Sequence, residues 1–163
     1  MNIIEELSKA VGNFLIPNNL RISVAESCTG GLIGATLTEI AGSSAYFRGG
    51  VIAYDNQIKK DILNVPQHVL DNFGAVSDQT VIAMAEGVCK LFKTECAISV
   101  SGIAGPGGGT ETKPVGLVFI AISFKDKVKS FRFIFSGDRQ EIRTQATRAA
   151  LEQLLAFVRQ FST

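Results

Sequence analysis

The chain has 163 residues, of which 46% are hydrophobic and 19% are charged, and its formal net charge is +1. This length fits one domain, expected over residues 1–163, with enough chain to build its own core. The low net charge argues against a large nucleic-acid-binding surface, and no apolar run reaches the roughly 20 residues that span a bilayer.

The N-terminal elements are predicted from hydrophobic periodicity. Apolar residues recur at helical spacing over residues 3–15, and Asn2 with Glu5 resembles a capping box. Because acidic residues stand where a signal peptide would be positively charged, this helix is not typical of an export signal. Residues 21–26 predict a strand, followed by a tight small-residue turn and a helix over residues 32–40.

Strands and helices continue to alternate in the middle of the chain. Residues 46–54 predict a second strand, and residues 56–63 and 69–73 predict short helices. Ser77 is a typical N-cap for a longer helix, after which residues 97–101 predict a short apolar strand.

The C-terminal third begins with a glycine-rich loop over residues 102–114. Residues 115–124 and 128–135 flank a short polar tip, which predicts a β-hairpin, and Asp138 opens a last helix running to about residue 161. The whole pattern predicts an α/β fold, a three-layer α/β/α sandwich with a mixed, mostly parallel sheet and one C-terminal β-hairpin. In such sheets ligands bind beyond the carboxyl ends of the strands, where both small-residue loops of this chain are expected.

The first of these loops is Glu26-Ser27-Cys28-Thr29-Gly30-Gly31. Backbone N–H groups at a helix N-terminus attract anions, and small residues allow close approach of a phosphate or carboxamide. A simple capped turn would have the same composition, because Ser and Thr are good caps.

The second loop, residues 101–109, holds five glycines directly after a strand. It is not a P-loop, because no Gly-Lys-Ser/Thr follows at the required spacing. It is not a dinucleotide-binding fingerprint either, because a GxGxxG motif that starts at Gly105 needs a glycine where the sequence has Thr110. ATP or NAD as a cofactor is therefore disfavoured, whereas a flexible surface loop remains an alternative.

A third candidate is Tyr54 with Asn56 and Lys59. If Tyr54 ends a strand and Lys59 begins a helix, both side chains can reach one cleft. A lysine shielded from water has a lowered pKa and becomes a usable base. The same sequence is also typical of a solvated Lys59–Lys60 pair on a helix.

Other nucleophiles and metal sites have weaker support. A Ser-His-Asp triad could use only His68, the single histidine, which lies in a polar helical stretch. Cys28 could be a nucleophile, but cysteine is also a common buried filler. The three cysteines form no CxxC pair, which indicates a reducing cytoplasm and neither a disulfide framework nor a zinc site.

Arg139 and Arg143 lie four residues apart in the first turns of the last helix and share a face. Two arginines beside glycine loops would suit a phosphate, although surface arginines are common. Several longer stretches stand in order around these candidates: AESCTGG (25–31), AGSSAYF (41–47), Tyr54-x-Asn56-x-x-Lys59, GAVS (74–77), SGIAGPGGG (101–109), KPVG (113–116) and SGDR (136–139).

Together these stretches resemble the C-terminal domain of the competence-damage protein CinA, and more closely the stand-alone nicotinamide-nucleotide amidases of that family. The resemblance implies hydrolysis of nicotinamide mononucleotide to nicotinic acid mononucleotide and ammonia, in NAD salvage. It implies Ser27 as nucleophile, with Lys59 and Tyr54 arranging proton transfer. The mechanism needs no metal and no organic cofactor, because water can cleave an acyl-enzyme.

The expected substrate-binding residues come from both loops, the Tyr54–Lys59 run and the last helix: Thr29, Gly30, Gly31, Asn56, Ser101, Gly102, Ala104, Gly105, Arg139 and Arg143. Oxyanion donors are expected either around Thr29–Gly31 or around Ser101–Gly105. The small-molecule substrate is the only expected partner besides a second copy of the chain, most simply in a dimer, with no nucleic acid and no membrane.

Two further functions use the same loops. One is a phosphorylated-nucleotide-binding module without turnover, and the other is a serine amidase acting on another small amide. A nucleic-acid adaptor is the least favoured alternative, because the sequence lacks a basic stripe.

Overall fold

The computed structural model describes residues 2–162; Met1 and Thr163, the outer ends of the expected domain, lie outside the described residues. The elements run in the order α1 (Ile3–Leu15), β1 (Ile22–Glu26), α2 (Leu32–Thr38), the 3-10 helix η1 (Ser43–Ala45), β2 (Phe47–Ile52), α3 (Asn56–Asp61), α4 (Gln67–Phe73), α5 (Asp78–Phe92), β3 (Cys96–Gly102), β4 (Leu117–Phe124), β5 (Lys127–Ile134) and α6 (Arg139–Gln160).

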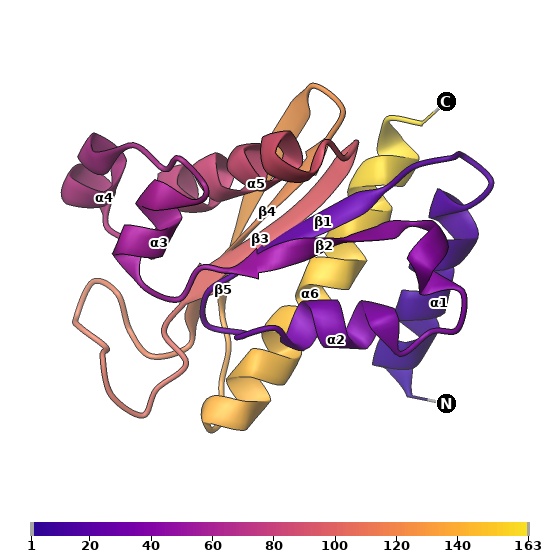
Figure 1. The fold of residues 1–163 in the computed structure, drawn as a ribbon. Coiled ribbons are helices and arrows are strands. Elements are labelled where there is room, and N and C mark those ends of the chain that lie inside the picture. The colour runs from indigo at the N-terminus through magenta and orange to yellow at the C-terminus, as the bar shows by residue number, and fades with distance from the viewer. Residues whose placement is uncertain (1, 163) are drawn as a thin grey trace.

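The five strands form one mixed sheet in the order β2-β1-β3-β4-β5 (Figure 1). Strand β1 is parallel to both β2 and β3, whereas β4 is antiparallel to β3 and β5. Four strands therefore run in one direction, and β4 returns between two of them as the first arm of the hairpin. The predicted mixed sheet with a C-terminal hairpin is confirmed.

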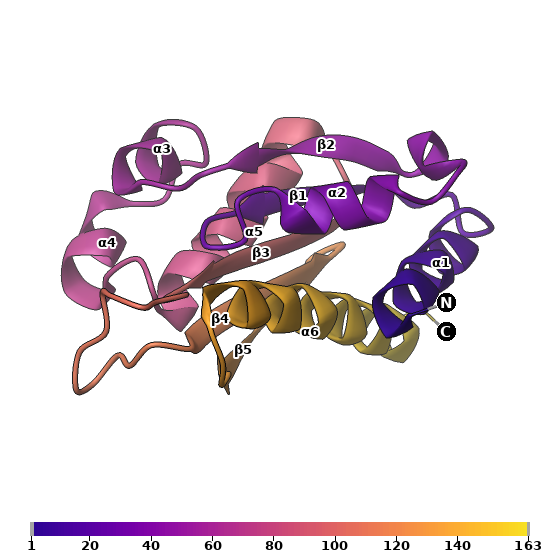
Figure 2. The same ribbon diagram turned by 90° about the horizontal axis from the view of Figure 1, so that it is seen from below.

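Helices cover both faces of this sheet, as Figures 1 and 2 show for α5 on one side and α6 on the other. Large side chains such as Val24 and Ile98 pack with α1, α2 and α6, whereas small ones such as Ala25 and Ala97 face α5. This division follows from the alternation of side chains along a strand. The predicted three-layer sandwich is confirmed, and no helix within residues 2–162 is long and apolar enough to cross a membrane.

The helix starts follow the capping residues. Asn2 accepts a hydrogen bond from the N–H of Glu5, and Ser77 accepts one from the N–H of Thr80. Asp138 and Glu141 form a complete capping box at the start of α6. These side chains satisfy N–H groups that the first helical turn leaves without a partner.

The largest differences from the sequence expectation are at element ends. The strand expected over residues 46–54 is β2, which stops at Ile52, and Tyr54 lies outside it. Asp55 instead caps α3 by accepting a hydrogen bond from the N–H of Ile58. The chain therefore leaves the sheet before Tyr54, which frees the carbonyls of residues 53 and 54 for other contacts.

Candidate active site

The candidate site lies at the carboxyl ends of adjacent parallel strands. Ser27 follows β1 directly, Ser101 is near the end of β3, and Tyr54 follows β2. The hydrogen bond from the Ser27 N–H to the Val100 carbonyl, 3.0 Å long, holds the start of the first loop against β3. Figure 1 shows these strand ends on the same side of the molecule as α3 and the glycine loop.

Ser27 and Lys59 form a buried pair there. The Lys59 Nζ lies 3.1 Å from the Ser27 Oγ, and only 1% of Lys59 is exposed. The amine also donates to the Ala53 carbonyl at 2.8 Å and to the Tyr54 carbonyl at 3.1 Å. Both carbonyls lie beyond the end of β2, where only the N–H of Ala53 still bonds to β1, at the Glu26 carbonyl.

Burial lowers the pKa of Lys59 below its ordinary value of 10.5, while the Asp55 carboxylate and the Cys28 thiol act in the opposite direction. A neutral amine has two N–H donors and one lone pair. If the two carbonyls take the N–H groups, the remaining tetrahedral position faces the Ser27 hydroxyl. In the structure the Ser27 hydroxyl donates to the Tyr54 carbonyl at 3.3 Å. When the hydroxyl turns from that carbonyl toward a neutral amine, the lone pair can accept the serine proton, as a general base must.

A cavity of about 200 Å³ opens over this pair. Its lining comes from five segments of the chain: Ser27, Cys28, Tyr54, Asn56, Lys59, Ala75, Val76, Ser101, Gly102, Ala104 and Arg139. Most of the expected site residues thus meet at one cavity. Ala75 and Val76 were not expected there, and the only sequence signal for them is their place in the GAVS stretch.

Ser101 contributes a hydroxyl-bearing side chain to the lining. The residue is 1% exposed and lies at the cavity near the end of β3. Its neighbour on the same face of β3, Ser99, instead donates to the Val81 carbonyl at 2.6 Å. Because Ser101 lines the cavity, its hydroxyl lies beside the space where a ligand would bind.

Tyr54 contacts the pair through its main chain. Its carbonyl accepts hydrogen bonds from Lys59 and Ser27, whereas its phenol oxygen accepts one from Arg139 Nη2 at 3.1 Å. The residue is 59% exposed. Among the described contacts, the phenol therefore reaches neither member of the pair, which differs from the expected role in proton transfer.

The first small-residue loop is organised by Glu26, whose role the sequence did not indicate. Its buried carboxylate accepts hydrogen bonds from the Thr29 hydroxyl at 2.6 Å and from the N–H groups of Ile33 and Gly34, each at 2.9 Å. Thr29 is fully buried. The N-terminus of α2 therefore already holds an anion, and its N–H groups are not free for a substrate phosphate.

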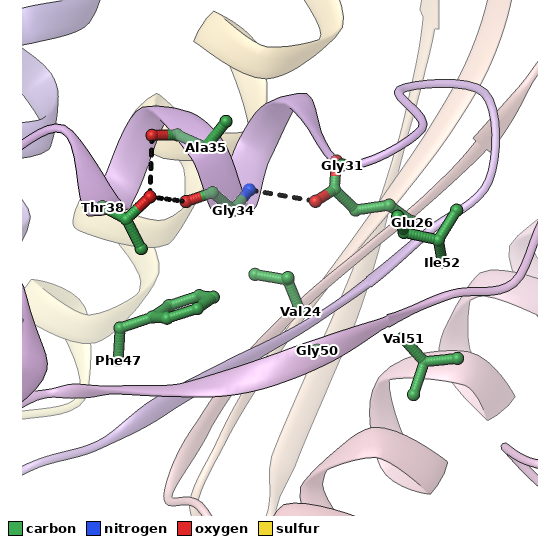
Figure 3. A pocket seen from close by; sticks show the side chains of 10 residues that line it. All are labelled: Val24, Glu26, Gly31, Gly34, Ala35, Thr38, Phe47, Gly50, Val51 and Ile52. Carbon is green, nitrogen blue, oxygen red and sulfur yellow. Dashed lines mark hydrogen bonds between the residues drawn. The ribbon is translucent and has the colours of Figure 1, made fainter.

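Gly30 and Gly31 shape the turn without lining the cavity over Ser27. Their φ angles are 59° and 108°, a region that favours glycine, and the N–H of Gly30 donates to the Ser27 carbonyl. Gly31 lines a separate pocket of about 270 Å³ between α2 and β2, which Figure 3 shows with Glu26 at one end. The expected direct roles of Thr29, Gly30 and Gly31 therefore gain no support from their positions.

The two arginines fasten both loops to α6. Arg139 donates to the Gly105 carbonyl at 2.7 Å, and Arg143 donates to the carbonyls of Cys28 and Thr29 at 3.0 and 2.9 Å. Arg139 and Arg143 also line a neighbouring pocket of about 310 Å³. Because Arg139 lines both this pocket and the cavity over Ser27, the two spaces adjoin.

The other candidate chemistries have less support. His68 is exposed on α4, and it does not line the cavity. Burial raises the pKa of the Cys28 thiol to about 12, which disfavours the thiolate that a nucleophile requires. No cluster of three potential metal ligands occurs in the part of the chain that the structure describes.

Comparison with known proteins gives a consistent family. The family model described as the CinA C-terminal domain matches residues 4–158. A CinA-like protein of Endomicrobium trichonymphae is 50% identical over 150 residues, which are 92% of this chain and 35% of that protein. A putative competence-damage inducible protein of Caldicellulosiruptor bescii is 51% identical over 148 residues, covering 91% of this chain and 36% of its own length. The chain thus spans about a third of the length of these relatives.

Solved structures resemble the chain over nearly its whole length. A competence/damage inducible protein of Agrobacterium tumefaciens superposes with a TM-score of 0.93 at 45% identity, with 96% of each chain covered. A competence damage-inducible protein A of Klebsiella pneumoniae gives a TM-score of 0.95 at 34% identity, covering 98% of this chain and 99% of its own. With the family match extending over residues 4–158, this chain belongs to the CinA C-terminal domain family.

Proposed function

We propose that this chain is an amidohydrolase that converts nicotinamide mononucleotide and water into nicotinic acid mononucleotide and ammonia, as a step in pyridine nucleotide salvage. The observation that carries the proposal is the 3.1 Å contact between the buried Lys59 amine and the Ser27 hydroxyl beneath a cavity. The resemblance noted in the sequence supplies the substrate, and the two adjoining pockets supply room for a nucleotide.

In the first half of the reaction, the Ser27 Oγ attacks the carboxamide carbon while the Lys59 Nζ takes the hydroxyl proton. The same amine then passes this proton to the departing nitrogen, ammonia leaves, and an ester to Ser27 remains. In the second half, water attacks the ester carbon and Lys59 receives a proton from the water. The bond to Ser27 breaks, and the serine recovers its proton. Lysine can serve in both halves because its pKa is lowered by burial.

The developing oxyanion needs hydrogen-bond donors near the attacked carbon. Of the two loops expected to supply them, the second has Ser101, Gly102 and Ala104 in the cavity lining, whereas the first has only Ser27 and Cys28. This favours the second loop, together with the N–H of Cys28, as the source of the donors.

The phosphate would lie in the pocket that Arg139 and Arg143 line. Each guanidinium has five N–H donors, and the contacts described above use two in each case. The remaining donors can bind phosphate oxygens while the amide occupies the neighbouring cavity. A nucleotide would then be preferred over the same amide without its phosphate.

The test is ammonia release from nicotinamide mononucleotide, its riboside and nicotinamide by the purified protein. We expect the mononucleotide to react fastest, Ser27→Ala to reduce its turnover at least about a hundredfold with binding nearly intact, and Arg143→Ala mainly to weaken binding. No ammonia from the wild-type protein, with or without added metal, would contradict the proposal. Tight binding of the mononucleotide without turnover would instead indicate a binding module.

A further inference from the structure

The side chain of Tyr54 has no part in the hydrolysis just described. Its main-chain carbonyl accepts from the Lys59 amine, but its phenol lies at the other end of the residue and accepts from Arg139. The residue is 59% exposed although its phenol oxygen is anchored. A large aromatic ring is thus held in place without being buried.

The two anchors define where this ring lies. One end of Tyr54 is at the catalytic pair, and the other is at Arg139, which also donates to the Gly105 carbonyl at 2.7 Å. Both Tyr54 and Arg139 line the cavity. The ring therefore extends along the exposed side of the cavity, from the reacting hydroxyl toward the second loop and the arginine pocket.

We propose that the Tyr54 ring is a stacking surface for the flat, cationic aromatic ring of the substrate, and that Arg139 is the positioning residue that holds it. This inference rests on the proposed function and deepens it by naming what recognises the ring. An anchored aromatic side chain loses little conformational freedom on binding, and its face attracts a positively charged ring. The phenol oxygen takes no part in proton transfer, because it contacts neither Lys59 nor Ser27.

The first experiment compares Tyr54→Phe with Tyr54→Leu in ammonia release from nicotinamide mononucleotide. Leucine removes the ring and should raise KM about tenfold with kcat changed by less than about threefold, since stacking on an aromatic residue is worth that order of affinity. Phenylalanine keeps the ring and loses only the bond to Arg139, so its KM should rise by less than about threefold.

A proton-transfer role for the phenol gives the opposite result. Tyr54→Phe would then lose at least about tenfold in kcat, as Tyr54→Leu would, and its pH–rate profile would change. A tenfold loss of kcat in Tyr54→Phe, or a changed pH–rate profile in that variant, would overturn the proposal. Phe161→Leu is the matched control, because it removes an aromatic ring at the C-terminal end of α6, away from the cavity.

The second experiment measures binding in a Ser27→Ala background, so that it does not depend on turnover. We expect oxidised nicotinamide mononucleotide, whose ring is planar and cationic, to bind about tenfold more tightly than the reduced form, whose ring is neutral and not aromatic. Adding Tyr54→Leu should remove this difference. Equal affinities before that substitution, or no binding of either form, would overturn the stacking role. Absence of ammonia from the wild-type protein with the binding difference intact would remove the hydrolysis alone.

Discussion

The two small-residue loops follow adjacent parallel strands and look alike in sequence, but the structure uses them differently. In the first loop, the Thr29 hydroxyl and the Gly30 N–H are bonded within the loop, and Arg143 binds two of its carbonyls. In the second loop, Ser101, Gly102 and Ala104 line the cavity. The first loop is therefore a rigid support for one nucleophile, and the second is a wall that can accept a ligand.

Small residues at the end of a strand can therefore have two different structural roles. Small residues let a chain turn tightly onto itself, as Gly30 and Gly31 do, or they let a neighbouring strand approach closely, as Gly102 does against Leu117 and Val118. In the first loop, the Glu26 carboxylate fixes the tight turn by accepting hydrogen bonds from the N–H groups of Ile33 and Gly34.

The largest effect on catalysis should come from a permanent charge at Lys59, whose amine contacts Ser27 of the first loop. Lys59→Arg keeps a cation that cannot lose its proton, so kcat should fall at least about a hundredfold at neutral pH. In the wild-type protein, kcat/KM should rise about tenfold per pH unit and level off above the pKa of Lys59, which burial lowers from its ordinary value of 10.5. The neutral amine is the active form, so the rate is lost as pH falls through that pKa.

A pH–rate profile and single-turnover kinetics measure both effects. Lys60→Arg, on the adjacent exposed position of α3, is the matched control and should retain the wild-type profile. A profile in Lys59→Arg that still rises in the same pH range would mean that another group is the base.

The fold could be predicted from the sequence more fully than the site. Periodicity and caps predict the strands, α5 after Ser77 and α6 after Asp138, because these signals are local in the chain. The Tyr54–Lys59 spacing allowed a shared cleft as one of two interpretations, and both residues do line one cavity. The choice of Ser27 and of a nucleotide substrate came from resemblance, since no spacing rule distinguishes this serine from a cap.

The unpredicted features depend on main-chain atoms or on distant partners. The main-chain carbonyls of Ala53 and Tyr54 bind the Lys59 amine. Every residue has such a carbonyl, so the residue types do not indicate which ones bind. Glu26 reads as the polar end of a strand, and its partners seven and eight residues later appear only after the turn is formed. Arg143 likewise finds its carbonyl partners more than a hundred residues away.

The second effect is on stability and tests whether the first loop is a support. Glu26→Gln replaces one acceptor by an N–H₂ group that faces backbone N–H donors, so the free energy of unfolding should fall by about 2 kcal/mol. Glu39→Gln, an exposed change just after α2, should stay within about 0.5 kcal/mol. Denaturant unfolding measures both, and equal values for the two variants would contradict the organising role of Glu26.

The smallest expected effects separate Ser101 from Ser99, which lie two residues apart on β3. Ser99→Ala removes a hydrogen bond to the Val81 carbonyl, so stability should fall by about 1 kcal/mol while the rate of ammonia release stays at the wild-type value. Ser101→Ala removes a hydroxyl that lines the cavity, so stability should hold while kcat/KM falls about tenfold. Thermal unfolding measures the stability of both variants, and steady-state kinetics measures their kcat/KM. A loss of stability without a loss of rate in Ser101→Ala would make the second loop structural like the first, and the contrast between the loops would disappear.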